Sequence, residues 1–178
     1  IKVAQAQTMG KVGQFCTQCH TPVAAFTQQT PVYFDEQTRR FTQNVVDIDE
    51  KARQGVSCDV CHSITGIIDT KNARLELTPN GVQRGTIRDP APNQFHESVY
   101  SPLHGESLVC SSCHAVTNGK GALIEQTFTE WSYSRYPTEG IECQTCHMPE
   151  YQGQAAVDGP ERTVHRHLFV GVDVSLLP

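Results

Sequence analysis

The hydrophobic positions of this chain occur in short patches that are separated by long polar stretches. Such a pattern predicts short elements joined by coil rather than long amphipathic helices. Early in the chain, Val32–Phe34 and Asn44–Ile48 have the composition of β-strands. No window approaches the ~18 consecutive apolar residues of a membrane-spanning helix, so we expect no membrane span.

A hairpin is expected within residues 66–90, because apolar patches there flank a turn signal. We expect this segment either to project as an insert or contact arm or to form a plain surface hairpin. The patches are Ile67–Ile68, Leu75–Leu77 and Val82–Ile87, and the turn residues are Pro79, Asn80 and Gly81.

A short helix is expected from about 128 to 136. Thr127 and Glu130 have the spacing of a capping box ahead of Trp131, and Pro137 marks the end. Elsewhere, short helical turns are expected only around the cysteine motifs described below.

The final segment, TVHRHLFVGVDVSLLP, has the alternation of a strand. It would place His165, His167 and Phe169 on one face, with the two histidines about 6–7 Å apart. The residues after them are apolar apart from one charge, and a strand edge of that kind is adhesive. We expect residues 164–178 either to pair within this molecule or to dock on a neighbour as an interface tail.

Large aliphatic side chains are few for a chain of 178 residues, with eight leucines and seven phenylalanines beside abundant Thr, Gln, Ser, Pro and Gly. The length suggests one domain over 1–178, which would bury roughly 70% of its unfolded surface if it folded unaided. We therefore expect another group to fill the core. The net charge of −5, with no basic run, argues against a nucleic-acid partner.

All eight cysteines belong to four copies of one motif, Cys-x-x-Cys followed at once by His. This motif is typical of covalent c-type haem attachment. On a helical turn, residues i, i+3 and i+4 share one face, so two sulfurs can bond one porphyrin edge while the imidazole binds the iron. The predicted attachment residues are Cys16, Cys19, Cys58, Cys61, Cys110, Cys113, Cys143 and Cys146, and the predicted proximal ligands are His20, His62, His114 and His147.

Three other uses of the cysteines explain less. A disulfide framework requires neither the adjacent histidine nor four identical spacings. A zinc ribbon pairs two Cys-x-x-Cys units roughly 15–20 residues apart, and a thioredoxin-like motif occurs singly near a βαβ pattern, which this chain lacks. Four haem c groups would also supply the missing apolar core, and the chain without them is expected to be largely unfolded.

The remaining histidines equal the predicted irons in number, so we expect them to be the distal ligands. Taken singly, each could also be an ordinary surface or core histidine. Met148 directly follows a proximal histidine, and Met9 is a poorer choice while histidines remain. Ligation by two histidines implies lower reduction potentials than His/Met ligation and leaves no open position for substrate. The four predicted distal ligands are His96, His104, His165 and His167.

Three segments, YSPLHGESLVCSSCH, WSYSRYPTEGIECQTCHMP and HRHLFVG, resemble the multihaem cytochromes related to hydroxylamine oxidoreductase and to the tetrahaem cytochrome that accepts its electrons. The similarity covers residues 95–170, and before them only the two motifs. Among tetrahaem relatives of this length, the chain is similar to the OmcE-type extracellular cytochromes, which polymerise into haem-wired filaments. The resemblance supports the proximal and distal ligands named above.

The resemblance implies a multihaem cytochrome c fold that is coil-rich, with short helices at the motifs, a few short strands and a core of closely packed haems. It also implies export, to the cell surface or to the periplasm. Further implied features are a homo-oligomeric filament, in which a neighbour can supply one distal histidine, and redox partner proteins or extracellular electron acceptors.

Three functions fit these residues. The first is an electron conduit of four bis-histidine haems that assembles into an extracellular filament. The second is a soluble periplasmic tetrahaem shuttle that docks on partners through charge. The third is a nitrogen-oxide oxidoreductase, in which one spare histidine is a bystander and one haem keeps an open position. We expect an electron carrier rather than an enzyme, because every iron has a candidate sixth ligand.

Overall fold

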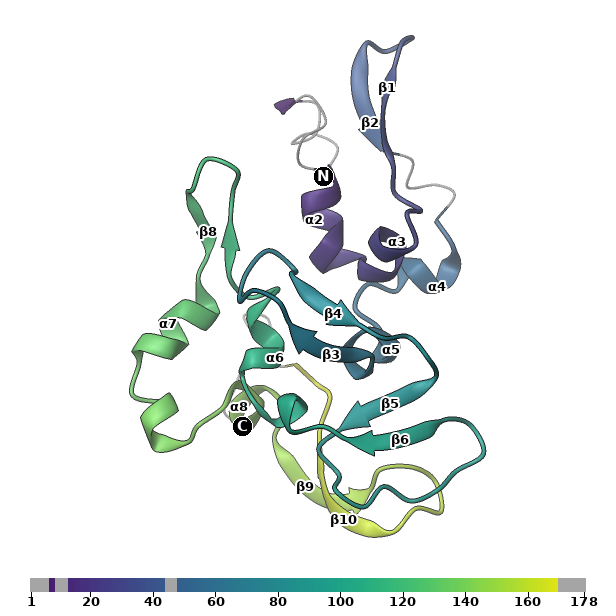
Figure 1. Ribbon diagram of the computed structural model, residues 1–178, viewed down its shortest axis with the longest axis vertical. Coiled ribbons are helices and arrows are strands. Elements are labelled where there is room, and N and C mark those ends of the chain that lie inside the picture. The colour runs from purple at the N-terminus through teal and green to yellow at the C-terminus, as the bar shows by residue number, and fades with distance from the viewer. Residues whose placement is uncertain (1–6, 9–12, 44–47, 170–178) are drawn as a thin grey trace. The chain divides into compact units, whose positions relative to one another are not determined.

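The computed structural model describes residues 7–8, 13–43 and 48–169 (Figure 1). None of the helices within these residues is long and apolar enough to cross a membrane. The contacts divide the chain into two compact units, Ile1–Cys61 and His62–Pro178. The single haem-filled domain expected over 1–178 stays a prediction, because it depends on contacts that haem itself would make.

The described part of the first unit contains short helices and one hairpin. Ala24, Ile48 and Ala52 form a small apolar cluster that joins the second of these helices to the third. Asp49 begins the third helix by accepting a hydrogen bond from the Lys51 N–H at 2.9 Å. The elements are α2 (Gly13–His20), α3 (Pro22–Phe26), β1 (Val32–Asp35), β2 (Arg40–Gln43) and α4 (Glu50–Arg53).

The antiparallel pair β1–β2 confirms the strand expected at Val32–Phe34. Asp35 ends β1 and shapes the turn, since its carboxylate accepts the Thr38 N–H at 3.3 Å. The Thr38 side chain and N–H together lower the pKa of Asp35 below its usual value. The second strand expected here, Asn44–Ile48, lies mostly outside the described residues.

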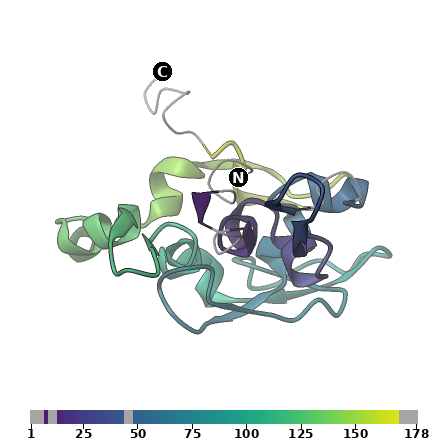
Figure 2. The ribbon, with the colours of Figure 1, turned by 90° about the horizontal axis from the view of Figure 1, so that it is seen from above.

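The second unit is built from two-stranded sheets and short helical turns. Three of its sheets are antiparallel and one is parallel. Figure 2 shows the segment from β7 to α7 (green) extending to one side of this unit. The elements are β3 (Ile64–Ile67) with β4 (Leu75–Leu77), β5 (Val82–Gly85) with β6 (Glu97–Tyr100), β7 (Val116–Thr117) with β8 (Leu123–Glu125), and β9 (Glu150–Gln154) with β10 (Glu161–His165), together with η1 (Pro102–Gly105), α6 (Leu108–Ser111), α7 (Thr127–Tyr133), η2 (Pro137–Glu139) and α8 (Cys143–His147).

The hairpin expected across Pro79-Asn80-Gly81 does not form, because the strands on its two sides pair with other strands. β4 pairs backward with β3, and β5 pairs in parallel with β6 through Val82 and Glu97. Asn80 does make a turn, since its side-chain oxygen accepts the Val82 N–H at 3.2 Å. That turn passes the chain from one sheet to the next. The local pattern identified strands but not their partners, because pairing depends on which surfaces the tertiary fold buries.

The helix expected near Trp131 is confirmed as α7, although it ends at Tyr133. The capping box expected at Thr127 was wrong. Gln126 is the N-cap residue and makes no side-chain cap, while Glu125 accepts the Thr127 N–H at 2.8 Å. A carboxylate two residues before the helix therefore replaces the hydroxyl cap, which agrees with the preference of helix N-termini for negative charge.

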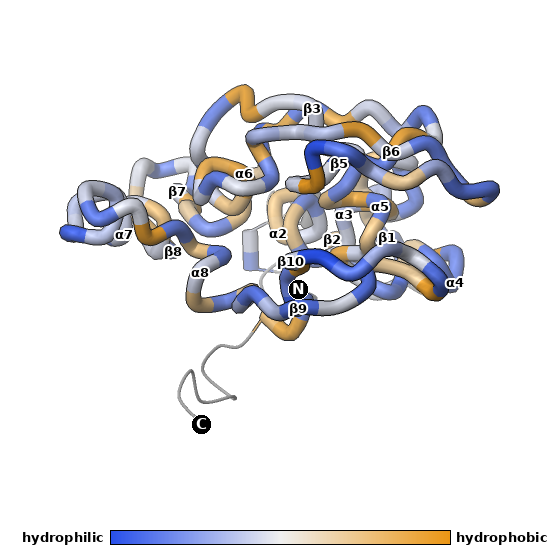
Figure 3. The backbone as a smooth tube through the Cα atoms, turned by 90° about the horizontal axis from the view of Figure 1, so that it is seen from below, coloured by the Kyte–Doolittle hydropathy of each residue, from blue (hydrophilic) through white to orange (hydrophobic). Residues whose placement is uncertain are grey.

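The polypeptide itself forms little apolar core. Among the described residues, the largest side chains with almost no exposure are small hydroxyl residues, Thr17, Ser107, Ser111 and Ser112. Hydrophobic and hydrophilic stretches alternate along most elements (Figure 3). This finding agrees with the scarcity of aliphatic residues in the sequence. That haem fills the core stays a prediction. The buried apolar residues are Ala24, Ile48, Ala52, Val60, Ile64, Ala115 and Val164.

Candidate functional site

Each Cys-x-x-Cys-His motif lies on a helical turn, as expected from the sequence. The motifs at Cys58–His62 and Cys143–His147 are the helices α5 and α8, and the first motif ends α2. α6 ends within the third motif, but the His114 N–H still donates to the Cys110 carbonyl at 3.1 Å. Positions i, i+3 and i+4 therefore share one face in every motif, which is the arrangement that attachment of one porphyrin edge requires.

None of the eight cysteines is in a disulfide, and none of them is fully buried. Burial, with a smaller effect of the neighbouring Cys58, raises the pKa of the Cys61 thiol. The described residues contain no group of three or more His, Cys, Asp or Glu side chains that could hold a metal ion. Haem iron needs only two protein ligands, because the porphyrin supplies the other four. Pairs of cysteines outside disulfides, each with one adjacent histidine, fit that requirement.

Five histidines have their Nδ1 atom fixed by a nearby oxygen. Where the partner is a main-chain carbonyl, Nδ1 must be the donor, so a neutral ring keeps its lone pair on Nε2. Metal-binding histidines are held in this way, with the second ring nitrogen orienting the first. The partners are the Arg84 carbonyl for His62 (2.5 Å), the Ser98 hydroxyl for His96 (3.1 Å), the Ser101 hydroxyl for His104 (2.9 Å), the Met148 carbonyl for His165 (2.8 Å) and the His165 carbonyl for His167 (3.0 Å).

Three of the predicted ligands come together although they lie far apart in the sequence. The ring centroids of His62 and His104 are 5.8 Å apart, and their planes differ by 12°. The centroids of His62 and His167 are 6.1 Å apart, with planes that differ by 33°. A proximal histidine thus has two candidate distal histidines around it.

The C-terminal strand is shorter than expected. β10 ends at His165, so His165 and His167 do not share a strand face, and that prediction was wrong beyond His165. His165 pairs with Glu150 of β9, and its Nε2 lies 3.7 Å from a Glu150 carboxylate oxygen. His167 follows the strand and is exposed. The rest of the expected interface tail, from residue 170, lies outside the described residues.

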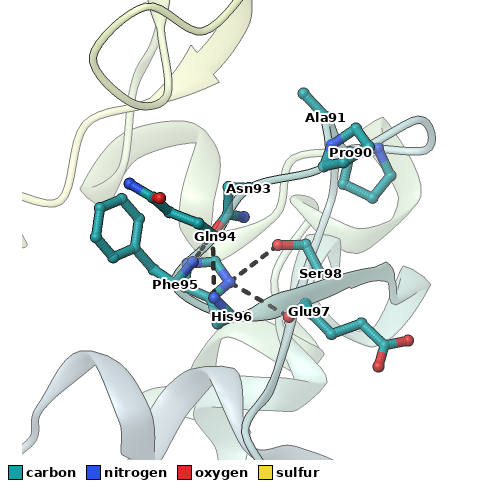
Figure 4. A pocket seen from close by; sticks show the side chains of 9 residues that line it. Pro90, Ala91, Asn93, Gln94, Phe95, His96, Glu97 and Ser98 are labelled. Carbon is teal, nitrogen blue, oxygen red and sulfur yellow. Dashed lines mark hydrogen bonds between the residues drawn. The ribbon is translucent and has the colours of Figure 1, made fainter.

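His96 lies in an exposed loop beside a hollow of about 540 Å³ (Figure 4). The Asn93 side chain shapes the loop by accepting the N–H groups of Phe95 at 2.8 Å and His96 at 3.1 Å. The His96 ring contacts the first two residues of β6, the Glu97 carbonyl at 3.3 Å and the Ser98 hydroxyl at 3.1 Å. The ring contacts described for His62, His104 and His167 do not include His96.

The third and fourth motifs meet at Ser107. The Cys143 N–H donates to the Ser107 hydroxyl at 2.7 Å. The Cys110 side chain is the main cause that lowers the pKa of Cys143 to about 6. Ser107 and the positive charge of His147 lower it further, whereas burial and Glu142 oppose the shift.

Two kinds of contributing residue were missed from the sequence. Ser101 orients His104 from three residues upstream, and this spacing was visible in the segment SPLH. Glu142 and Thr145 form the capping box of α8, with the acid at the N-cap and the hydroxyl at N3. That order reverses the usual capping box, so the usual pattern search does not find it.

The comparisons with known proteins identify a family. The family model for cytochrome c552 matches residues 1–122, which include the first three motifs with His96 and His104. The matched stretch contains the first 90 residues, where the resemblance seen in the sequence rests on the two motifs alone. Neither curated proteins nor solved structures gave a match.

Proposed function

We propose that this chain, which belongs to the cytochrome c552 family, carries four haems with two histidine ligands each. Membership of the family makes it a c-type cytochrome that transfers electrons through haem. The observation behind the proposal is that the number of histidines outside the motifs, four, equals the number of motif histidines. All four spare rings have Nδ1 held by an oxygen, which supports a common role.

Haem c supplies one-electron redox chemistry at its iron when bound. The eight cysteines would hold the porphyrins by two thioether bonds each, and the motif histidines would bind the irons from the proximal side. The carbonyl and hydroxyl partners of Nδ1 would set ring orientation and ligand basicity, and through them the potentials. Mass spectrometry of the purified protein tests the count, and a mass increase of fewer than four haems would contradict it.

The second motif and His104 would supply the two axial ligands of one iron. At a metal–nitrogen distance of about 2 Å, two imidazoles on opposite faces of an iron have centroids about 6 Å apart. The 5.8 Å between the ring centroids of His62 and His104 supports this pair. His167, also near His62, would then serve a neighbouring iron.

We further propose that the protein is exported and assembles outside the cell as a filament. Export is typical of cytochromes c. Exposed apolar side chains support assembly, because large exposed apolar groups suit protein interfaces. They include Leu168 and Phe169 at the end of the described chain and Phe95 next to His96. The exposed His96 also suits a ligand that is given to a neighbouring subunit.

Electron micrographs and sedimentation of the holoprotein test assembly. Filaments are expected, whereas a monodisperse monomer would contradict the filament and favour the periplasmic shuttle, to which the net charge of −5 would give an electrostatic docking face. Electron paramagnetic resonance tests the ligands. Low-spin signals alone are expected, and a high-spin signal that changes with nitrite or cyanide would instead favour a nitrogen-oxide enzyme.

A further inference from the structure

The N-terminal ends of α6 and α8 are both hydrogen-bonded to one buried residue, Ser107. Its main-chain carbonyl accepts the Cys110 N–H at 3.0 Å, and its hydroxyl accepts the Cys143 N–H at 2.7 Å. Its own N–H donates to the Glu142 carboxylate at 2.6 Å. Ser107 therefore contacts the first cysteine of the third motif and the first cysteine of the fourth motif.

A buried amide strengthens this junction. Gln144, inside the fourth motif, donates from Nε2 to the carbonyls of His104 at 3.1 Å and Glu106 at 2.9 Å. Its side chain is almost fully buried, and its Oε1 atom has no hydrogen-bond partner. Residues 104–107 thus hold α8 by several hydrogen bonds. The same short segment carries His104, the proposed ligand of the second haem.

The hydrogen bonds at Ser107 also affect where the side chains of the two cysteines lie. Cys110 and Cys143 are both hydrogen-bonded to Ser107 through their main-chain N–H groups, and the effect of the Cys110 side chain on the pKa of Cys143 agrees with their closeness. After haem attachment, each sulfur would join a porphyrin edge through one vinyl-derived carbon. Two porphyrins held by adjacent sulfurs must have neighbouring edges.

We propose that Ser107 is a positioning residue that holds the third and fourth haems as one electronically coupled pair. This inference rests on the proposed attachment of haem at both motifs. An electron would pass directly between these two haems. The protein would control their spacing through the Ser107 hydroxyl, because the described chain forms little apolar core.

The test is a matched pair of buried-serine variants in the holoprotein. Ser107→Ala removes the acceptor of the Cys143 N–H. Ser111→Ala removes an equally buried hydroxyl from the same helix, but that hydroxyl donates only within α6, to the Leu108 carbonyl at 2.6 Å. Circular dichroism in the Soret band reports coupling between close haems. We expect Ser107→Ala to lose the wild-type couplet and Ser111→Ala to keep it, with four haems attached in both.

A redox titration gives a second readout. In Ser107→Ala, the two haems that interact in the wild type should titrate with less mutual influence. Glu142→Ala, at a partly exposed position, removes the acceptor of the Ser107 N–H and should shift the couplet in the same direction. If Ser107→Ala does not bind all four haems, the couplet of Glu142→Ala tests the inference in its place.

Specific outcomes would overturn the inference. A wild-type couplet in Ser107→Ala, or in Glu142→Ala, with full haem content shows that the junction does not set the coupling. Loss of the couplet in Ser111→Ala as well would assign the effect to general loosening of α6. A wild-type protein that carries fewer than four haems would instead contradict the proposed function itself.

Discussion

The imidazole rings of His62 and His104 lie with their centroids 5.8 Å apart and their planes within 12° of parallel. One ring follows the second Cys-x-x-Cys pair, and the other lies in η1, ahead of the third. Each has Nδ1 next to an oxygen, the Arg84 carbonyl for His62 and the Ser101 hydroxyl for His104. The spacing of the centroids is the observation behind the proposal that both histidines bind one iron.

Replacement of His104 tests this pair directly. In His104→Ala, we expect one haem to become high-spin while all four remain attached, because the cysteines are untouched. His104→Met is the matched control, and it should restore a low-spin iron at a higher potential, since a methionine ligand raises the potential. Electron paramagnetic resonance and a redox titration measure both. A fully low-spin His104→Ala protein would contradict the assignment.

His167 is predicted to bind a different iron. His167→Ala should therefore also produce one high-spin haem, with all four haems still attached. The double variant with His104→Ala should produce two, because two irons would then each lack a ligand. Spin quantification by electron paramagnetic resonance distinguishes one from two. A low-spin spectrum of the single variant would remove His167 from the ligands.

Trp131 is predicted to anchor α7 next to the fourth motif. Its indole N–H donates to the Ile141 carbonyl at 2.9 Å, just before α8. Trp131→Phe keeps an aromatic ring beside Phe128 but loses this bond, so it should lower the free energy of unfolding by about 1 kcal/mol. Denaturant unfolding followed by far-ultraviolet circular dichroism measures the change. Tyr133→Phe, on the same helix at an 88% exposed position, should have almost no effect.

Removal of haem is expected to unfold most of the chain, because the described polypeptide buries few apolar side chains. Far-ultraviolet circular dichroism of protein produced without haem attachment measures the loss of structure. Alkylation of Cys143 gives a local test. An unfolded chain should show the ordinary cysteine pKa of roughly 8.5. If alkylation instead follows the pKa of about 6 that Cys110 and Ser107 impose, α6 and α8 remain docked without haem.

The helical turns could be predicted from the sequence because their cause is local. The four Cys-x-x-Cys-His segments of this chain each lie on a helical turn, and α5 and α8 coincide with their motifs. The strand at Val32–Phe34 and the helix at Trp131 were also predicted correctly, since each depends on nearby residues. The assignment to a c-type cytochrome followed from the same motifs and agrees with the family match.

Pairing could not be predicted in the same way. The sequence suggested that β4 and β5 would meet across Asn80, but β4 pairs with β3 and β5 with β6. The approach of His104 and His167 to His62 likewise depends on contacts between distant segments. Short hydrophobic patches between polar stretches carry little information about which distant segment they will contact, because many strand pairings bury similar amounts of surface.

By itself, the sequence determined which atoms are predicted to hold haem: eight thiols and eight imidazoles in fixed local order. The tertiary structure alone decided which of these atoms become neighbours. It brought His62 close to His104 and joined Cys110 to Cys143 at Ser107. The physical reason is that ligand chemistry belongs to single side chains and their near neighbours, whereas distances between haem sites depend on hydrogen bonds that only the folded chain makes.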